Sequence, residues 1–442
     1  MELMARFGIP LALSLAFVSR LAWGGAAFGG MGGVGVGIAD PSGDLSVNPA
    51  TAAADLRSEE GVVRVGMSWE RLTFAGNAYN RIPGQKTVST FTVARNMGWS
   101  FVTPALVESD GRIGFGSWPV FGRGLDMNEA LDMSLPLRPG LPMLKDVFTQ
   151  STTGTTELKQ RESLDVVGAV WIQPIGARLS QFAVGAGYAS LSSFGSVRVA
   201  ATEPVHQNQY SLAHVVSHRD LTGPALMAGF FYRPLKEGSV GVGVLYTGKM
   251  NGKIWGQSEG GPVYTDTMSR PAQLRLGLGG FFSMFQGLNV AVDVEYSGEN
   301  RSPARTLFAG TSAAYSASEY SDATFALRAG LEYQLRFWDF DIPVRTGFFT
   351  CPDPLPANTS GLGADSVSDF RPVSFKQDVT GVTFGTGWSS KGLRADVALM
   401  WLMVTTHVRL RNAVGFVDSG DVRSSLGAVG SVALVFKKTP LE

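Results

Sequence analysis

The chain has 442 residues, of which 55 are glycine and 27 phenylalanine, and only 17% are charged. Lysine plus arginine and aspartate plus glutamate both number 37, so the net charge is zero, which argues against a nucleic-acid partner. A mean hydropathy of +0.09 is too low for a bundle of membrane helices. No composition break divides the chain, so we expect one large domain, and the lone Cys351 excludes an internal disulfide.

Residues 1–24 have the pattern of a signal peptide. Arg6 supplies the positive charge, residues 7–18 form an apolar core too short to span a bilayer, and Ala22-Trp23-Gly24 offers a small-x-small cleavage site. The mature chain is therefore expected to begin near Gly25 and to be exported. Residues 24–54 lack any period of two and predict turns and short helices.

In many segments between residues 61 and 442, apolar side chains recur at every second position. Val290, Val292 and Val294 share one parity, whereas Asp293 and Glu295 share the other. A strand directs successive side chains to opposite faces, and a Lys or Arg facing mid-bilayer lipid costs roughly 2–4 kcal/mol. We therefore predict a transmembrane antiparallel β-barrel of about 14 strands. The expected strands are 62–75, 99–108, 111–121, 163–173, 182–199, 221–233, 239–253, 271–283, 287–297, 320–336, 340–350, 377–389, 392–408 and 424–436.

The connections between these segments alternate in length. Short turns on one rim and long loops on the other are typical of an outer-membrane barrel, whose long loops face the outside of the cell. A soluble half-buried sheet would also alternate, but its outward face would carry more charge than these segments do. The long loops are expected at 122–162, 200–220, 254–270, 298–319, 351–376 and 409–423.

The order of these pieces resembles the FadL/TodX family of outer-membrane transporters for long-chain fatty acids and other hydrophobic compounds. Residues 35–56, GVGIADPSGDLSVNPATAAADL, are similar to the family's N-terminal segment with its Asn-Pro-Ala motif. Residues 101–127 are similar to its second and third strands, and VRTGFFTCPDPLP within 327–356 to its Arg-x-Gly-aromatic segment. Thr51 departs from the glycine that usually follows Asn-Pro-Ala.

The resemblance implies a barrel with an N-terminal hatch, here 25–60, inside the lumen. It also implies ligand capture by extracellular loops and lateral release through an opening at a kinked third strand. Asn48, Pro49 and Ala50 are then the hatch turn, expected beside that strand. Proline cannot donate to a ladder and glycine weakens a strand, which favours a lateral portal there, the alternative being an early strand end. The portal residues are Gly116, Pro119, Phe121 and Gly122.

The segment 122–162 is unusually apolar for an extracellular loop. Exposed apolar patches tend to mark binding sites, and methionine adapts to irregular partners. We interpret the segment as a ligand-capture loop, the alternative being a loop that packs on itself. Its candidate residues are Leu125, Met127, Leu131, Met133, Leu141, Met143 and Phe148.

Charges expected to face the lumen could pair with one another or, less readily, hold a ligand carboxylate. They are Arg64, Asp165, Arg275, Asp293, Arg328, Arg345 and Asp396. We expect no catalytic residue, cofactor or metal, because His214 and His218 have i, i+4 spacing in a predicted loop and no third ligand is evident.

The sequence thus predicts a passive outer-membrane transporter of hydrophobic small molecules rather than an enzyme. Its expected partners are the hydrophobic ligand, outer-membrane lipid and the barrel-assembly machinery, for which Phe436 could supply the C-terminal signal. Three alternatives stay open: a FadL-like barrel repurposed as a surface binding or assembly protein, a barrel enzyme, and a general porin.

Overall fold

The structure is a computed structural model. It describes residues 31, 33–38, 45, 47–75, 88–92, 96–106, 110–132, 153–176, 180–202, 209–235, 237–258, 261–285, 287–303, 305–310, 315–317, 320–337, 340–352, 373–390, 392–412 and 415–437. The predicted signal peptide, residues 1–24, lies outside these ranges. Regular structure in the described part is β-strand except for the 3-10 helix η1 (Thr51–Ala53). The described residues include no helix long and apolar enough to cross a bilayer.

The strands of the first half are β1 (Glu60–Ala75), β2 (Val88–Thr92), β3 (Asn96–Val102), β4 (Arg112–Asp132), β5 (Thr153–Ile175), β6 (Ser180–Thr202), β7 (Gln209–Leu235), β8 (Gly238–Thr247), β9 (Met250–Ser258) and β10 (Val263–Arg270). Those of the second half are β11 (Gln273–Phe285), β12 (Leu288–Ser297), β13 (Asn300–Arg301), β14 (Arg305–Leu307), β15 (Tyr315–Ala317), β16 (Tyr320–Ser321), β17 (Thr324–Phe337), β18 (Phe340–Cys351), β19 (Val373–Ser390), β20 (Leu393–Asn412) and β21 (Gly415–Lys437).

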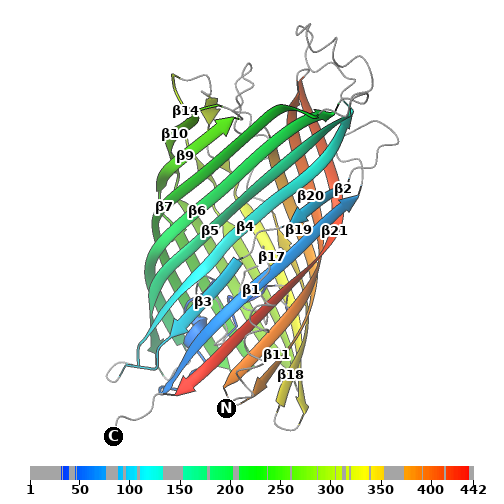
Figure 1. The fold of residues 1–442 in the computed structure, drawn as a ribbon. Coiled ribbons are helices and arrows are strands. Elements are labelled where there is room, and N and C mark those ends of the chain that lie inside the picture. Colours follow the sequence, from blue (N-terminus) through cyan, green and yellow to red (C-terminus); the bar gives the residue numbers. More distant parts are fainter. Residues whose placement is uncertain are drawn as a thin grey trace, which may run out of the picture.

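These strands close into one antiparallel barrel, tilted against its axis (Figure 1). The first and last strands pair from Glu60↔Lys437 to Arg71↔Leu426, which removes the free edges. Three staves of the wall are each made of two strands in succession, β2 with β3, β8 with β9 and β10 with β11. Counted this way the barrel has 14 staves, which confirms the predicted number.

Side-chain exposure follows the predicted parity. On β12, Val292 and Val294 are 42% and 41% exposed on the outside, whereas Asp293 and Glu295 are 0% and 7% exposed on the inside. The same alternation places exposed aliphatic and aromatic side chains on the outer face of the neighbouring strands. An apolar outer face and a charged inner face are what a bilayer demands of a barrel wall.

Turns at the rim where β1 begins and β21 ends, the lower rim in Figure 1, are short. Ile175 and Ser180, Leu235 and Gly238, Phe285 and Leu288, Phe337 and Phe340, and Ser390 and Leu393 are the strand ends that these turns join. Gly176, Gly287 and Gly392 have φ of 65°, 86° and 87°, the left-handed region that glycine enters without steric cost.

At the upper rim the strands extend further than predicted. β4 and β5 stay paired from Arg123↔Glu162 to Asp132↔Thr153, through a segment expected to be loop. Likewise β20 and β21 pair as far as Asn412↔Gly415, where the prediction placed a loop at 409–423. The alternation of lipid-facing residues ends at the edge of the bilayer, but the backbone groups still need partners and the adjacent strand supplies them.

Candidate functional site

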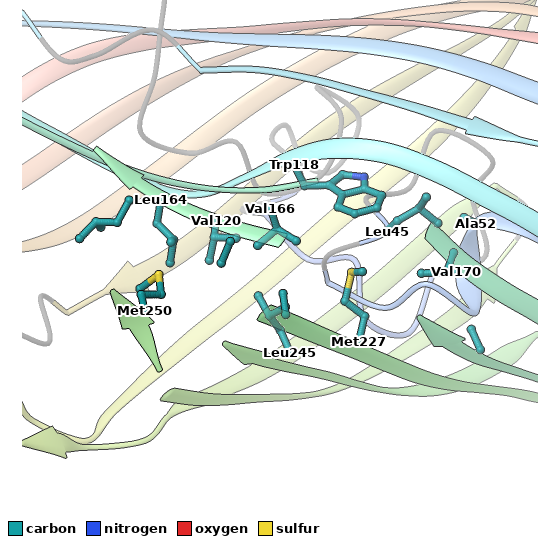
Figure 2. Packing of buried hydrophobic residues seen from close by; sticks show 14 of the residues in the cluster. Leu45, Ala52, Trp118, Val120, Leu164, Val166, Val170, Met227, Leu245 and Met250 are labelled. Atoms are coloured by element: carbon teal, nitrogen blue, oxygen red, sulfur yellow. The ribbon is translucent and has the colours of Figure 1, made fainter. Parts of the chain in front are cut away.

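Apolar side chains gather on the inner wall of β4 through β10. Trp118 and Val120 on β4 lie near Leu164, Val166 and Met227, as Figure 2 shows. All are at most 5% exposed. In a soluble protein such residues would be the core, but here they face the lumen. We call this set the apolar wall: Trp118, Val120, Leu164, Val166, Val170, Leu191, Leu221, Met227, Leu245 and Met250.

The opposite side of the lumen carries paired charges. Arg328 Nη2 lies 2.7 Å from Glu295 Oε2. Arg345 bridges Glu332 and Asp396, each at 2.7 Å, and Arg394 donates to Asp396 at 2.8 Å. Acids and bases alternate through β12, β17, β18 and β20, so each of these side chains has a partner of opposite sign. The charges of this wall are therefore best explained as ion pairs that stabilise the barrel. An apolar ligand would not need to contact them.

A second charge cluster lies on β5, β7 and β10. Glu162 accepts from Arg219 at 2.9 Å, and Arg270 Nη1 lies 3.9 Å away. The three side chains are at most 10% exposed. The sequence analysis did not single them out, because they stand in segments predicted as loop or at a strand edge.

Two of the predicted lumen charges need separate comment. Asp165 was predicted to face inward, which is wrong. Its neighbours Leu164 and Val166 are buried on the inside, so Asp165 shares the outward parity of Val167, which is 54% exposed. Arg275 does face inward, and its Nη1 donates to the carbonyl of Val120 on β4 at 3.3 Å.

The N-terminal segment, residues 31–57 as far as described, contacts the inner wall. Asp293 on β12 accepts hydrogen bonds from the amides of Gly35 and Val36 at 2.5 and 2.9 Å. Ser239 on β8 donates to the carbonyl of Gly37 at 2.7 Å. These bonds satisfy backbone groups that have no strand partner, and thus place the segment within the barrel.

Asn48, Pro49 and Ala50 form a turn at the centre of this segment. The side chain of Asn48 accepts from the amide of Ala50 at 3.1 Å and donates to the carbonyls of Val36 at 2.7 Å and Phe230 on β7 at 3.0 Å. One amide group thus ties two parts of the segment to the wall. The predicted place beside β4 is taken by Leu45, whose side chain lies 3.2 Å from where a Cβ on Gly114 would stand.

Glycines on the wall let the segment approach the strands at backbone distance. A Cβ on Gly241 would meet the carbonyl oxygen of Val36 and lie 2.8 Å from Asn48 Nδ2. One on Gly330 would lie 2.6 Å from Met31 Cβ. We call these residues the glycine track: Gly229, Gly241, Gly243, Gly279 and Gly330, on β7, β8, β11 and β17. Sequence reasoning missed the track, because glycine is frequent everywhere in this chain.

Arg112, which sequence reasoning also missed, joins the end of the segment to the lower rim. Its guanidinium donates to the carbonyls of Leu56 at 3.1 Å, Arg57 at 2.5 Å and Thr103 at 3.2 Å, and also to that of Glu60. The sequence feature that could have identified Arg112 is its charge at the first inward-facing position of β4. Its several carbonyl partners stabilise a charge that is only 4% exposed.

The wall is irregular at Pro119. The β4–β5 register shifts between Pro119↔Asp165 and Phe121↔Leu164, so Val120 is an extra, bulged residue. On the other side of β4, the ladder to β3 runs from Val102↔Gly114 to Trp99↔Ser117, and within the described residues no further ladder joins β4 to β2 or β3. Pro119 packs over β3 there, with its Cδ 3.1 Å from where a Cβ on Gly98 would stand.

The other predicted portal residues belong to the same stretch of β4. A Cβ on Gly116 would lie 2.6 Å from the carbonyl oxygen of Trp99 and 2.7 Å from the Trp118 ring. Phe121 and Gly122 pair with Leu164 and Ser163 of β5. The structure thus gathers Gly116, Pro119, Phe121 and Gly122 around one interruption of the wall.

The predicted capture loop is corrected in part. Leu125, Met127 and Leu131 lie on β4, not in a loop, because 123–132 pair with β5. Met133, Leu141, Met143 and Phe148 lie outside the described residues. His214 and His218 lie on β7, also predicted as loop, and His218 Nε2 lies 2.6 Å from Asp220 Oδ2.

Neither a protein-family model nor a curated protein matches the sequence. Several solved structures match nearly the whole chain. The P. putida toluene transporter TodX is 14% identical, with a TM-score of 0.54 over 95% of this chain and 100% of TodX. The Ralstonia pickettii toluene transporter TbuX is 14% identical, with a TM-score of 0.52 over 96% and 100%. For CymD, a monoaromatic hydrocarbon channel, the values are 12%, 0.50, 95% and 99%.

These matched proteins are transporters and channels by name, not enzymes. At such low identity the matches establish the fold alone. The chain therefore has the barrel fold of the toluene and monoaromatic-hydrocarbon channels, the fold that the resemblance to the FadL/TodX family predicted.

Proposed function

We propose that the protein is a passive outer-membrane transporter of hydrophobic small molecules, aromatic hydrocarbons or long-chain fatty acids. The observation that carries the proposal is the apolar wall beside the interrupted β3–β4 ladder. A lumen built only for structure or for water flow has no use for a patch of tryptophan, leucine and methionine beside an interrupted ladder of its own wall.

The strength of the patch suits a carrier that must release its ligand. An aromatic ring buries about 150–250 Å² of surface. At about 25 cal/mol per Å², moving it from water to the apolar wall contributes roughly 4–6 kcal/mol, before the cost of ordering the ligand. Such a ligand is held weakly enough to leave again without an energy source.

Release is proposed to be lateral. The N-terminal segment serves as the hatch, with Asn48, Pro49 and Ala50 as its turn, and it contacts β7, β8, β12 and β17 across the lumen. The interruption at Pro119 offers a path into the bilayer, which an apolar molecule prefers to water. We further propose that the β4–β5 hairpin, with Leu125, Met127 and Leu131, captures ligand on the outer side.

A reversible cross-link tests the lateral path. Gly98→Cys and Pro119→Cys, in a Cys351→Ser background, put two thiols across the end of the β3–β4 ladder. We expect oxidation to stop uptake of labelled toluene by cells that depend on this protein, and reduction to restore it. A control pair, Val167→Cys with Tyr188→Cys, stands on the continuous β5–β6 ladder and should leave uptake unchanged in both states.

Uptake that is equal in the oxidised and reduced portal variant would exclude lateral release but leave transport in place. Absence of uptake of toluene and of a long-chain fatty acid by the unmodified protein would contradict the transport function itself. That result would favour the alternative of a surface binding or assembly protein.

A further inference from the structure

Trp118 occupies a defined position at the inner edge of the interruption. It precedes Pro119 on β4 and is only 1% exposed. Its ring lies back over Gly116, where a Cβ would be 2.7 Å from both Cε2 and Cζ2. Any larger residue at position 116 would move the ring, so the pair sets the direction of the indole.

The indole N–H of Trp118 has no hydrogen-bond partner among the described residues. A buried tryptophan N–H usually has one. The side chains that share its cluster are apolar, among them Leu45, Val120, Val166 and Met227, and Figure 2 places the ring above them. The result is a neutral donor within the apolar wall.

The lumen arginines whose contacts the structure gives have other partners, including Arg219, which donates to Glu162 on the strands of the apolar wall. Arg275 reaches the same strand but donates to the carbonyl of Val120. Arg328, Arg345 and Arg394 are paired with carboxylates on the charged wall. A carboxylate placed against the indole would therefore gain one hydrogen bond and leave its charge without a counterion in an apolar setting, which is costly.

We propose that Trp118 Nε1–H donates a hydrogen bond to the ligand and so selects apolar molecules that carry one neutral acceptor oxygen, such as aryl ketones and esters. The inference rests on the proposed function and names a substrate class within it. A hydrocarbon of the same shape fills the apolar wall equally well but leaves the donor unpaired.

The test uses two ligands of similar shape, acetophenone and ethylbenzene, which differ by the carbonyl oxygen. Binding to the purified barrel in lipid nanodiscs is measured by equilibrium dialysis, with protein-free nanodiscs subtracted. Trp118→Phe keeps an aromatic ring and removes the donor. We expect about tenfold weaker binding of acetophenone, the loss typical of one hydrogen bond, and unchanged binding of ethylbenzene.

Trp401→Phe is the matched control, because Trp401 is 57% exposed on the outer face. It should leave the affinities for both ligands unchanged. Equal affinities of the Trp118→Phe variant and the unmodified protein for acetophenone would overturn the inference while leaving transport intact. Failure of the unmodified protein to bind either ligand would instead contradict the proposed function.

If Trp118→Phe does not fold, the affinities of the unmodified protein for the two ligands still test the inference. Ethylbenzene is the more hydrophobic of the two compounds, so a wall without a working donor must prefer it. Equal or tighter binding of acetophenone supports the assignment, and binding in the order of hydrophobicity contradicts it.

Discussion

Single glycines decide how closely the N-terminal segment approaches the wall. Gly238 and Gly241 stand on the same strand, β8, yet their surroundings differ. A Cβ on Gly238 would meet nothing nearer than 3.6 Å, whereas one on Gly241 would run into the carbonyl of Val36 and lie 2.8 Å from Asn48 Nδ2. Gly238 is thus a glycine that the strand merely tolerates, whereas Gly241 is one that the docking of the segment requires.

Gly241→Ala should therefore loosen the segment, while Gly238→Ala should not. We expect the first change to cost roughly 1–3 kcal/mol of docking free energy, because the added methyl overpacks a rigid contact. Hydrogen exchange at the amides of Gly35 and Val36, which Asp293 binds, reports this directly. Equal protection in both variants would mean that the segment is not held by the glycine track.

At the scale of the element, β4 is the strand that breaks the regularity of the wall. Its bulge at Val120 leaves a backbone carbonyl outside the ordinary ladder, and Arg275 reaches across from β11 to bind it. A bulge bends a strand and re-aims its side chains, and here it turns Trp118 and Val120 toward the same apolar wall. The hydrogen bond from Arg275 therefore stabilises the bulged conformation of β4.

Arg275→Met should weaken β4 locally. Loss of a hydrogen bond from a charged donor to a buried carbonyl costs roughly 1.5–3 kcal/mol, or about 10- to 100-fold in an opening equilibrium. We expect exchange of the backbone amides of Trp118, Val120 and Phe121 to accelerate by that factor. Arg233→Met, which removes a partly exposed ion pair with Asp55, is the control and should leave β4 exchange unchanged.

At the scale of the whole molecule, the lumen has two chemically different halves. The apolar wall runs over β4 to β9, and the charged wall over β12 to β20. Buried charges are tolerated when each has a partner, and Arg345 links two acids at once. The charged wall thus stabilises one side of the barrel, while the opposite side carries the apolar wall together with the Glu162, Arg219 and Arg270 cluster.

Arg345→Met should strongly destabilise the barrel, since Glu332 and Asp396 would both lose a buried partner. We expect the free energy of unfolding of the detergent-folded protein to fall by roughly 3–5 kcal/mol. It is measured by urea titration, with heat-modifiable gel mobility as the readout of folding. Lys249→Met, at an exposed position, is the control and should change the free energy of unfolding by no more than about 0.5 kcal/mol. Adding Glu332→Gln and Asp396→Asn to Arg345→Met should recover part of the loss, and no recovery would contradict the pairing argument.

Several features of the fold were predictable because they depend on near neighbours in the chain. Val292 and Val294 alternate with Asp293 and Glu295, and alternation alone says which pair faces lipid. The short lower turns carry glycine at the positive-φ positions, such as Gly287 and Gly392. The upper strand ends were predicted less well, since the pairing of Asp132 with Thr153 continues where the lipid pattern has stopped.

The sequence by itself thus determined the barrel, its number of staves, the face turned to lipid and the irregular stretch at Pro119, because each follows from parity or from the backbone chemistry of one residue. Only the tertiary structure decided that Asn48 binds β7, that Arg275 meets Val120 and that apolar and charged walls face each other. Those contacts join residues far apart in the chain, and their partners are set by how the closed, tilted sheet brings opposite strands together, which no local pattern contains.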